Sequence, residues 1–162
     1  MSIDGFAIAV AHEGSSWRLT ELDDALLDDL DALLTALRRL SVDGGAIFAM
    51  VEVDEEFFAV VRPVPGGAAL LLSDATAALD FDVAADILDL LHVEVPDEDD
   101  VDDDEPWPEG DMAILADFGL SEQEMQIIVD DDDLYPDEQL QLIANRCGFG
   151  EEFAALADAD RD

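Results

Sequence analysis

Two histidines and a single cysteine are the side chains of this sequence that could act as a base, a nucleophile or a soft metal ligand. His12 falls in a predicted turn and His92 at the end of a predicted helix, and neither has a cysteine or a second histidine at metal-ligand spacing. Cys147 falls on the apolar side of a predicted helix, where a cysteine is more often a core residue than a nucleophile. The glycine-rich phosphate loops and the Gly-x-Ser-x-Gly motif are absent. The sequence therefore predicts a protein that is not an enzyme, with no catalytic residue, no metal site and no cofactor.

Carboxylates are the abundant chemical group, with 43 Asp and Glu residues among 162. A calcium-binding EF-hand loop needs a glycine at its sixth position and a glutamate at its twelfth. Neither of the two acidic runs, 97–105 and 130–133, contains that glycine. We expect weak, diffuse binding of divalent ions and no specific cage.

The longer acidic run divides the chain. Eight of its nine residues are carboxylates, namely Asp97, Glu98, Asp99, Asp100, Asp102, Asp103, Asp104 and Glu105. Like charges at this density favour a solvated segment without regular structure. Trp107 follows directly, between two prolines, and has two interpretations: it packs where the chain re-enters the fold, or it anchors a partner that the acidic run attracts. These eight carboxylates and Trp107 are the predicted partner-binding residues.

The charge balance restricts the class of partner. Six arginines and no lysine oppose the carboxylates, and the formal net charge is -37. Direct binding of nucleic acid needs clustered cations, and an anionic membrane would repel this chain. A basic protein is the natural complement. The alternative explanation of the charge is solubility, or adaptation of a whole proteome to high salt.

The location of the protein is predicted from two features. A single cysteine excludes an internal disulfide and fits a reducing cytoplasm. The first residues lack the basic region of a secretory signal, and the apolar run that follows is too short for a membrane span. We expect a cytoplasmic protein.

The elements before the acidic run predict an α+β module. Apolar runs at 3–11, 46–53, 57–64 and 68–72 and an alternating segment at 16–20 indicate strands of an antiparallel sheet. Leucines at steps of three and four indicate a helix over 22–40, which Thr20 and Asp23 would cap, and a second helix follows over 83–91. The order is ββαβββα, and helices can cover one face of the sheet.

The elements after the acidic run are helical. Asp111 can cap a short helix that ends at Gly119, and Ser121 opens a capping box for the next helix. Pro136 begins a further helix that ends at Gly148, and a short final helix follows. We therefore expect an α+β module over 1–93, an acidic linker over 94–110 and a helical region over 111–158. So small a helical region should pack on the first module or on a partner.

The combination of several segments resembles a known family. These segments are 53–57 (Val-Asp-Glu-Glu-Phe), 71–75 (Leu-Leu-Ser-Asp-Ala), 115–119 (Leu-Ala-Asp-Phe-Gly) and 146–149 (Arg-Cys-Gly-Phe), arranged around the acidic run. With the N-terminal hairpin and the Leu/Asp helix, they are similar to the actinobacterial tRNA adenosine deaminase-associated proteins over nearly the full chain. The resemblance implies association with the deaminase that makes inosine in tRNA, and it implies no defined activity.

The deaminase itself needs a His-x-Glu motif and a Pro-Cys-x-x-Cys motif to hold zinc and move protons. Residues His92, Val93 and Glu94 spell the first motif, but one cysteine cannot supply the second. The leading hypothesis is therefore a non-catalytic acidic accessory protein that binds a basic partner, with the tRNA adenosine deaminase as the candidate. One alternative is a nucleic-acid mimic that inhibits its partner. The other is an unrecognised metal-dependent hydrolase built on the Asp clusters.

Overall fold

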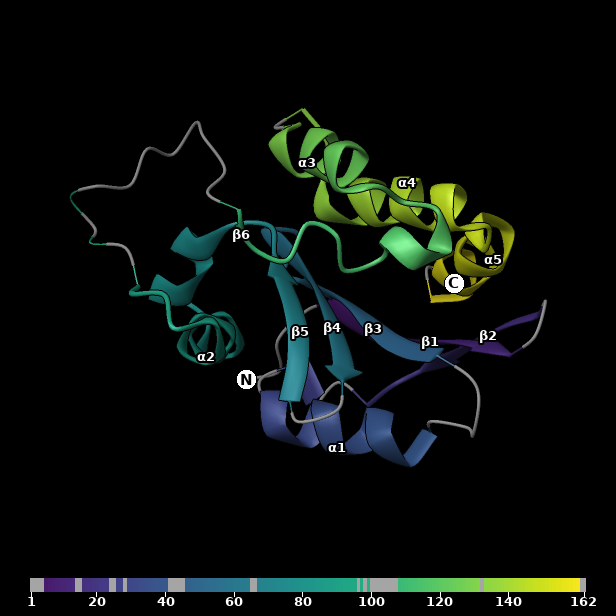
Figure 1. Ribbon diagram of the computed structural model, residues 1–162, viewed down its shortest axis with the longest axis horizontal. Helices are drawn as coiled ribbons and strands as arrows, with labels where there is room; N and C mark the ends of the chain where they lie inside the picture. The colour runs from purple at the N-terminus through teal and green to yellow at the C-terminus, as the bar shows by residue number, and fades with distance from the viewer. Residues whose placement is uncertain are drawn as a thin grey trace.

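The computed structural model describes residues 5–13, 16–23, 26–27, 29–40, 46–64, 67–95, 97, 99, 108–131 and 133–160 (Figure 1). Its strands are β1 (Gly5–Glu13), β2 (Ser16–Glu21), β3 (Ala46–Val53), β4 (Phe57–Val64), β5 (Gly67–Leu72) and β6 (Glu109–Gly110). Its α-helices are α1 (Leu30–Leu40), α2 (Asp82–Leu91), α3 (Glu122–Asp130), α4 (Pro136–Cys147) and α5 (Gly150–Asp160). Two short 3-10 helices, η2 (Ala75–Leu79) and η4 (Ala116–Phe118), complete these elements. The predicted α+β class and the ββαβββα order are confirmed.

The strands form one antiparallel sheet in the order β2-β1-β3-β4-β5-β6. Side chains alternate between the two faces of a strand, so Ala7 and Ala9 of β1 face one side while Ile8 and Val10 face the other. All four of these side chains are buried. The apolar runs are unbroken because both faces of the sheet are covered, and the expectation of helices on one face alone describes half of the arrangement.

The first helical layer covers the face that carries the alanines of β1. Helices α1 and α2 pack there, and α1 inserts Leu30, Leu33 and Leu37. The small side chains of β1 leave room for these leucines. In Figure 1 this layer lies below and to the left of the sheet.

The second helical layer covers the opposite face. Helices α3, α4 and α5 pack over Phe48, Met50 and Phe58, and Phe149 and Phe153 are buried in the same cluster. Figure 1 shows these helices above the sheet, in green and yellow. The helical region after residue 111 thus lies on the sheet, and β6 includes the last two residues of the predicted linker range. The division of the chain into separate domains stays a prediction.

The helix predicted over 22–40 is wrong in its first part. Helix α1 begins at Leu30, where the Asp29 carboxylate accepts a hydrogen bond of 3.0 Å from the Ala32 amide. Thr20 belongs to β2, and the amide of Leu22 still bonds to the sheet through the Ala7 carbonyl at 2.8 Å. Tertiary pairing therefore overrides the helical spacing of the first leucines.

Most predicted helix ends are confirmed. Gly119 and Gly148 adopt the left-handed conformation, with φ of 100° and 105°. The Ser121 hydroxyl accepts a hydrogen bond of 3.2 Å from the Glu124 amide, and Pro136 is the first residue of α4. Within the part of the chain that the structure describes, no helix has the length and apolar character needed to cross a membrane.

Candidate functional site

Two elements of the fold lie on either side of the acidic run 97–105, which is called the acidic segment below. Before it, α2 ends at Leu91. The next residue, His92, is left-handed (φ 61°), and the Val93 amide donates to the Leu88 carbonyl at 2.9 Å. After it, β6 pairs with β5, and Glu109 of β6 lies opposite Leu72 of β5. Because α2 also contacts β5, the described residues on both sides of the acidic run 97–105 belong to elements that pack against β5.

The predicted partner-binding residues fall in two groups. Asp97 and Asp99 are described and exposed to solvent. The others lie outside the described residues: Glu98, Asp100, Asp102, Asp103, Asp104, Glu105 and Trp107. Glu94 and Val95, which precede them, are also exposed. The partner-binding role of the segment stays a prediction.

A glycine fixes the point where the acidic segment rejoins the sheet. Gly110 has φ of 118°, and a Cβ placed on it would collide with the Leu70 carbonyl oxygen. The next amide, of Asp111, donates to that same oxygen at 2.8 Å. The close approach of the two backbones therefore requires a residue without a side chain.

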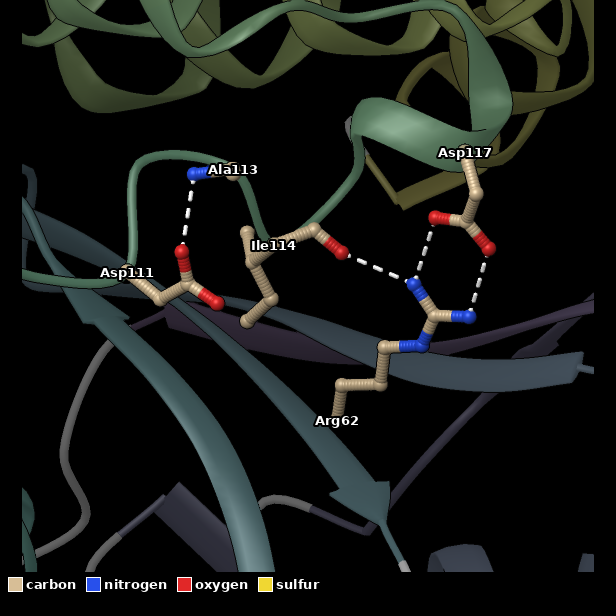
Figure 2. A network of polar contacts seen from close by, with 5 residues as sticks. All are labelled: Arg62, Asp111, Ala113, Ile114 and Asp117. Carbon is tan, nitrogen blue, oxygen red and sulfur yellow. Dashed lines mark hydrogen bonds and ion pairs between the residues drawn. The ribbon is translucent and has the colours of Figure 1, made fainter.

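Arg62 of β4 binds the part of the chain that follows β6, at Ile114 and Asp117 (Figure 2). Its Nη1 and Nη2 donate to the two carboxylate oxygens of Asp117 at 2.7 and 2.8 Å, and Nη1 also donates to the Ile114 carbonyl at 2.8 Å. The guanidinium lies 5.0 Å from the centre of the Phe118 ring. This paired geometry lowers the pKa of the Asp117 carboxyl below its usual range. One side chain thus ties the returning chain to the sheet.

Replacing Arg62 with methionine should lower the free energy of unfolding by about 2 kcal/mol, because methionine keeps an apolar stem and loses every charged hydrogen bond. The Arg62 side chain is only 20% exposed, so water replaces those bonds poorly. Urea unfolding measures the loss. The matched control is Asp117→Asn, whose side chain is 55% exposed and keeps one acceptor. An equal loss in the two variants would contradict a role for the Ile114 and Phe118 contacts.

A cluster of aromatic rings includes Phe118, which lies beside Arg62. His12 and Trp17 are cross-strand partners with ring centres 4.3 Å apart, and the Phe118 ring lies 5.6 and 5.3 Å from them. Phe149 lies 4.8 Å from Trp17. The placement of His12 in a turn is wrong, because it lies in β1 and is half-buried among these rings. The packing explains His12 without a catalytic role.

Three of the six arginines make contacts within the fold. Arg62 binds Asp117, Arg38 donates to the Gly67 carbonyl at 3.1 Å, and Arg146 lies 4.0 Å from Glu124. An exposed ion pair as long as the last one contributes little stability. Carboxylates remain the dominant charge of the chain, because 43 Asp and Glu residues oppose only six arginines.

A second acidic surface lies on the first helical layer. Asp86 of α2 has a raised pKa, first because it is partly buried and then because Asp82, Asp31, Asp29 and Asp89 repel its charge. These five carboxylates come from α2 and from the start of α1. The α1–α2 layer therefore carries a concentrated negative charge of its own.

The residues that could carry chemistry are held apart. Cys147 is buried in the second layer, whereas His92 is exposed at the end of α2. Among the described residues, no three His, Cys, Asp or Glu side chains come together in a way that could hold a metal ion.

Cys147 should be unreactive in the folded protein. Burial, and to a lesser degree Asp117, raises the pKa of its thiol to about 12, so the thiolate is scarce at neutral pH. A thiol reagent with a coloured product should therefore react slowly with the native chain and completely in denaturant. Rapid reaction of the native protein, at the rate of a free thiol in solution, would contradict this burial.

The sequence contains signals for the residues that were missed. Arg62 is the single charged residue of the strand Phe57–Val64, and a lone cation in an apolar strand predicts a specific partner. Glu52 stands in the same way between Val51 and Val53. No signal predicts the two-residue strand β6, because its pairing depends on a distant part of the chain.

Comparison with known proteins confirms the family predicted from the resemblance. A family profile described as Rv3753c-like tRNA adenosine deaminase-associated protein matches residues 5–150. The chain is 47% identical over 155 residues to Protein Rv3753c of Mycobacterium tuberculosis (strain ATCC 25618 / H37Rv), which covers 96% of this chain and 88% of the relative. No solved structure matches the chain. The description names an associate of the deaminase rather than the deaminase, and the chain belongs to the Rv3753c-like tRNA adenosine deaminase-associated protein family.

Proposed function

We propose that the chain is a non-catalytic accessory protein that binds a basic surface of a partner protein, and that this partner is a tRNA adenosine deaminase. The observation that carries the proposal is the position of the acidic segment 97–105, whose flanking residues are held at one edge of the sheet by α2 and β6. A concentrated charge held in a fixed place can direct a partner to one face of the molecule. The family description supplies the candidate partner.

The binding mechanism follows from the charge. Carboxylates of the segment approach first, because opposite charges steer the encounter at long range. The α1–α2 carboxylates add to the same field. Trp107 then supplies a large apolar contact, since an aromatic side chain beside a charged rim is a common centre of binding energy. The sheet and its two helical layers carry the described residues on either side of the segment.

The first experiment is a calorimetric titration of the purified chain with the deaminase at about 50 mM and at about 200 mM salt. We expect a stoichiometric complex whose dissociation constant rises with salt. Deletion of 97–105 should leave the free energy of unfolding almost unchanged and weaken the complex. Absence of a complex at both salt concentrations would contradict the proposal. Unfolding of the deletion variant would contradict the role of the segment as a linker.

Adding tRNA to the complex separates assistance from mimicry. An accessory protein should remain bound, or bind more tightly, when the deaminase holds tRNA. A chain whose carboxylates replace phosphates would instead be displaced by tRNA, because both occupy the same cationic surface. Displacement with a matching inhibition constant would replace the accessory role with an inhibitory one.

A further inference from the structure

Glu52 of β3 is the charged side chain that the described structure buries most deeply, with 5% of its surface exposed. It follows Phe48 and Met50 on the sheet face that α3, α4 and α5 cover. Its neighbours across the strands are Phe6 of β1 and Phe58 of β4. A carboxylate between aromatic side chains loses most of its hydration, so its neutral form is favoured.

The carboxyl group holds a turn in an unusual conformation. Asp54 and Glu55 connect β3 to β4 with φ of 53° and 58°, a region that side chains other than glycine and asparagine disfavour. The Glu55 amide donates to Glu52 Oε1 at 2.6 Å, and the Glu56 amide donates to the Val53 carbonyl at 2.9 Å. The short bond from Glu55 therefore links the buried carboxyl directly to the turn.

The charged groups that face Glu52 are all acidic in the described residues. Asp54 and Glu55 belong to the turn, and Asp137 belongs to the first turn of α4. Gly5 and Phe6 of β1 and Phe58 of β4 contribute no charge. A cavity of about 340 Å³ opens between the turn and the sheet, lined by Gly5, Glu52, Asp54 and Glu55. The cavity gives the carboxyl proton a route to water.

Two opposing effects set the proton equilibrium of Glu52. Burial raises its pKa most, and repulsion from Asp137, Glu55 and Asp54 adds to that effect. The hydrogen bond from the Glu55 amide lowers the pKa of Glu52, because a donated N–H stabilises the ionised carboxylate. The resulting pKa is about 7, well above the ordinary value of 4.5. The Glu52 carboxyl therefore gains or loses its proton near neutral pH.

We propose that Glu52 couples the β3–β4 turn to the start of α4 through the gain and loss of its proton. When the proton leaves to water, the bond from the Glu55 amide becomes stronger and the turn tightens. The same negative charge repels the Asp137 carboxylate in the first turn of α4, a helix that packs against β3. Protonation reverses both changes. This coupling is independent of the proposed function, because it concerns groups outside the acidic segment.

Proton–nitrogen NMR spectra of the full chain, recorded from about pH 5 to about pH 9, test the coupling. We expect the amide signals of Glu55 and of the first turn of α4 to shift with one shared midpoint near neutral pH. Glu52→Gln should abolish both shifts, since glutamine keeps the acceptor and cannot ionise. Asp137→Asn should move the midpoint to lower pH, because it removes a repelling charge.

Glu56→Gln is the matched control. Its pKa is also raised, first by partial burial and then by repulsion from Asp54, Asp80 and Asp74, and Asp137 is not among these charges. The near-neutral midpoint of the Glu55 and α4 signals should survive this substitution. A midpoint near the ordinary glutamate value would overturn the proposal. A shift of the Glu55 signal that leaves the α4 signals unchanged would overturn it as well, because no coupling would then exist.

Discussion

The substitution Gly110→Ala is expected to lower the free energy of unfolding by about 3 kcal/mol, because backbone strain and a steric clash both destabilise the folded state. Gly110 has φ of 118°, which an alanine adopts only with strain. The added Cβ would also collide with the Leu70 carbonyl oxygen, which already accepts a hydrogen bond from Asp111. Release of that contact would separate β6 from β5. Urea unfolding, followed by fluorescence, measures the loss.

Gly67→Ala is the matched control for this prediction. A Cβ at Gly67 meets no heavy atom within 4 Å, and the backbone there needs no positive φ. Its effect should be within about 0.5 kcal/mol of zero, with the loss of unfolded-state freedom favouring the variant. If the two alanine variants unfolded at the same urea concentration, the close approach of β6 to β5 would be wrong.

Glu52→Gln has the second large expected effect, and it depends on pH. The folded chain binds the Glu52 proton more tightly than the unfolded chain, since the pKa rises from 4.5 to about 7. The contribution of this group is therefore fully favourable below pH 4.5 and is lost as pH rises to about 7. Glutamine remains neutral throughout. The variant should be more stable than the wild type by about 2 to 3 kcal/mol at about pH 8.

Denaturation of both proteins at several pH values checks this prediction. The difference between their free energies of unfolding should grow from about pH 5 to about pH 7 and then remain constant. The comparison isolates Glu52, because every other carboxylate is common to both chains. A variant that is less stable at high pH would show that the ionised carboxylate is the favoured form in the fold.

The fold was largely predictable because the sheet strands are short apolar runs separated by turn residues. Strands 46–53 and 57–64 match β3 and β4 at both ends. Helix α1 was predicted too long, because leucines at helical spacing also occur where the chain still bonds to β1 through Leu22. Coverage of both sheet faces was missed, although the unbroken run of β1 contains the signal for it.

The candidate site was predictable in part. The acidic run and Trp107 are visible in composition alone, yet their place in the fold depends on β6 and Gly110, which follow from long-range pairing. Arg62 and Glu52 are lone charges in apolar strands, and a search for such charges would have selected both. Their partners, Asp117 and the Glu55 amide, are set by the tertiary structure and by an unusual turn.

The central claim is that the acidic segment binds the partner because of its position and not only because of its charge. Two variants with equal loss of charge separate these explanations. One replaces Asp102, Asp103 and Asp104 of the segment with asparagine, and the other replaces Asp82, Asp86 and Asp89 of α2 with asparagine. Both variants carry three fewer negative charges than the wild type.

The deciding measurement is the dissociation constant of the deaminase complex for the wild type and both variants at about 50 mM salt. The segment variant should bind about tenfold more weakly than the wild type, and the α2 variant less than about threefold more weakly. Unfolding curves of the free variants ensure that both are folded. Equal weakening in the two variants, or no weakening in either, would contradict the account.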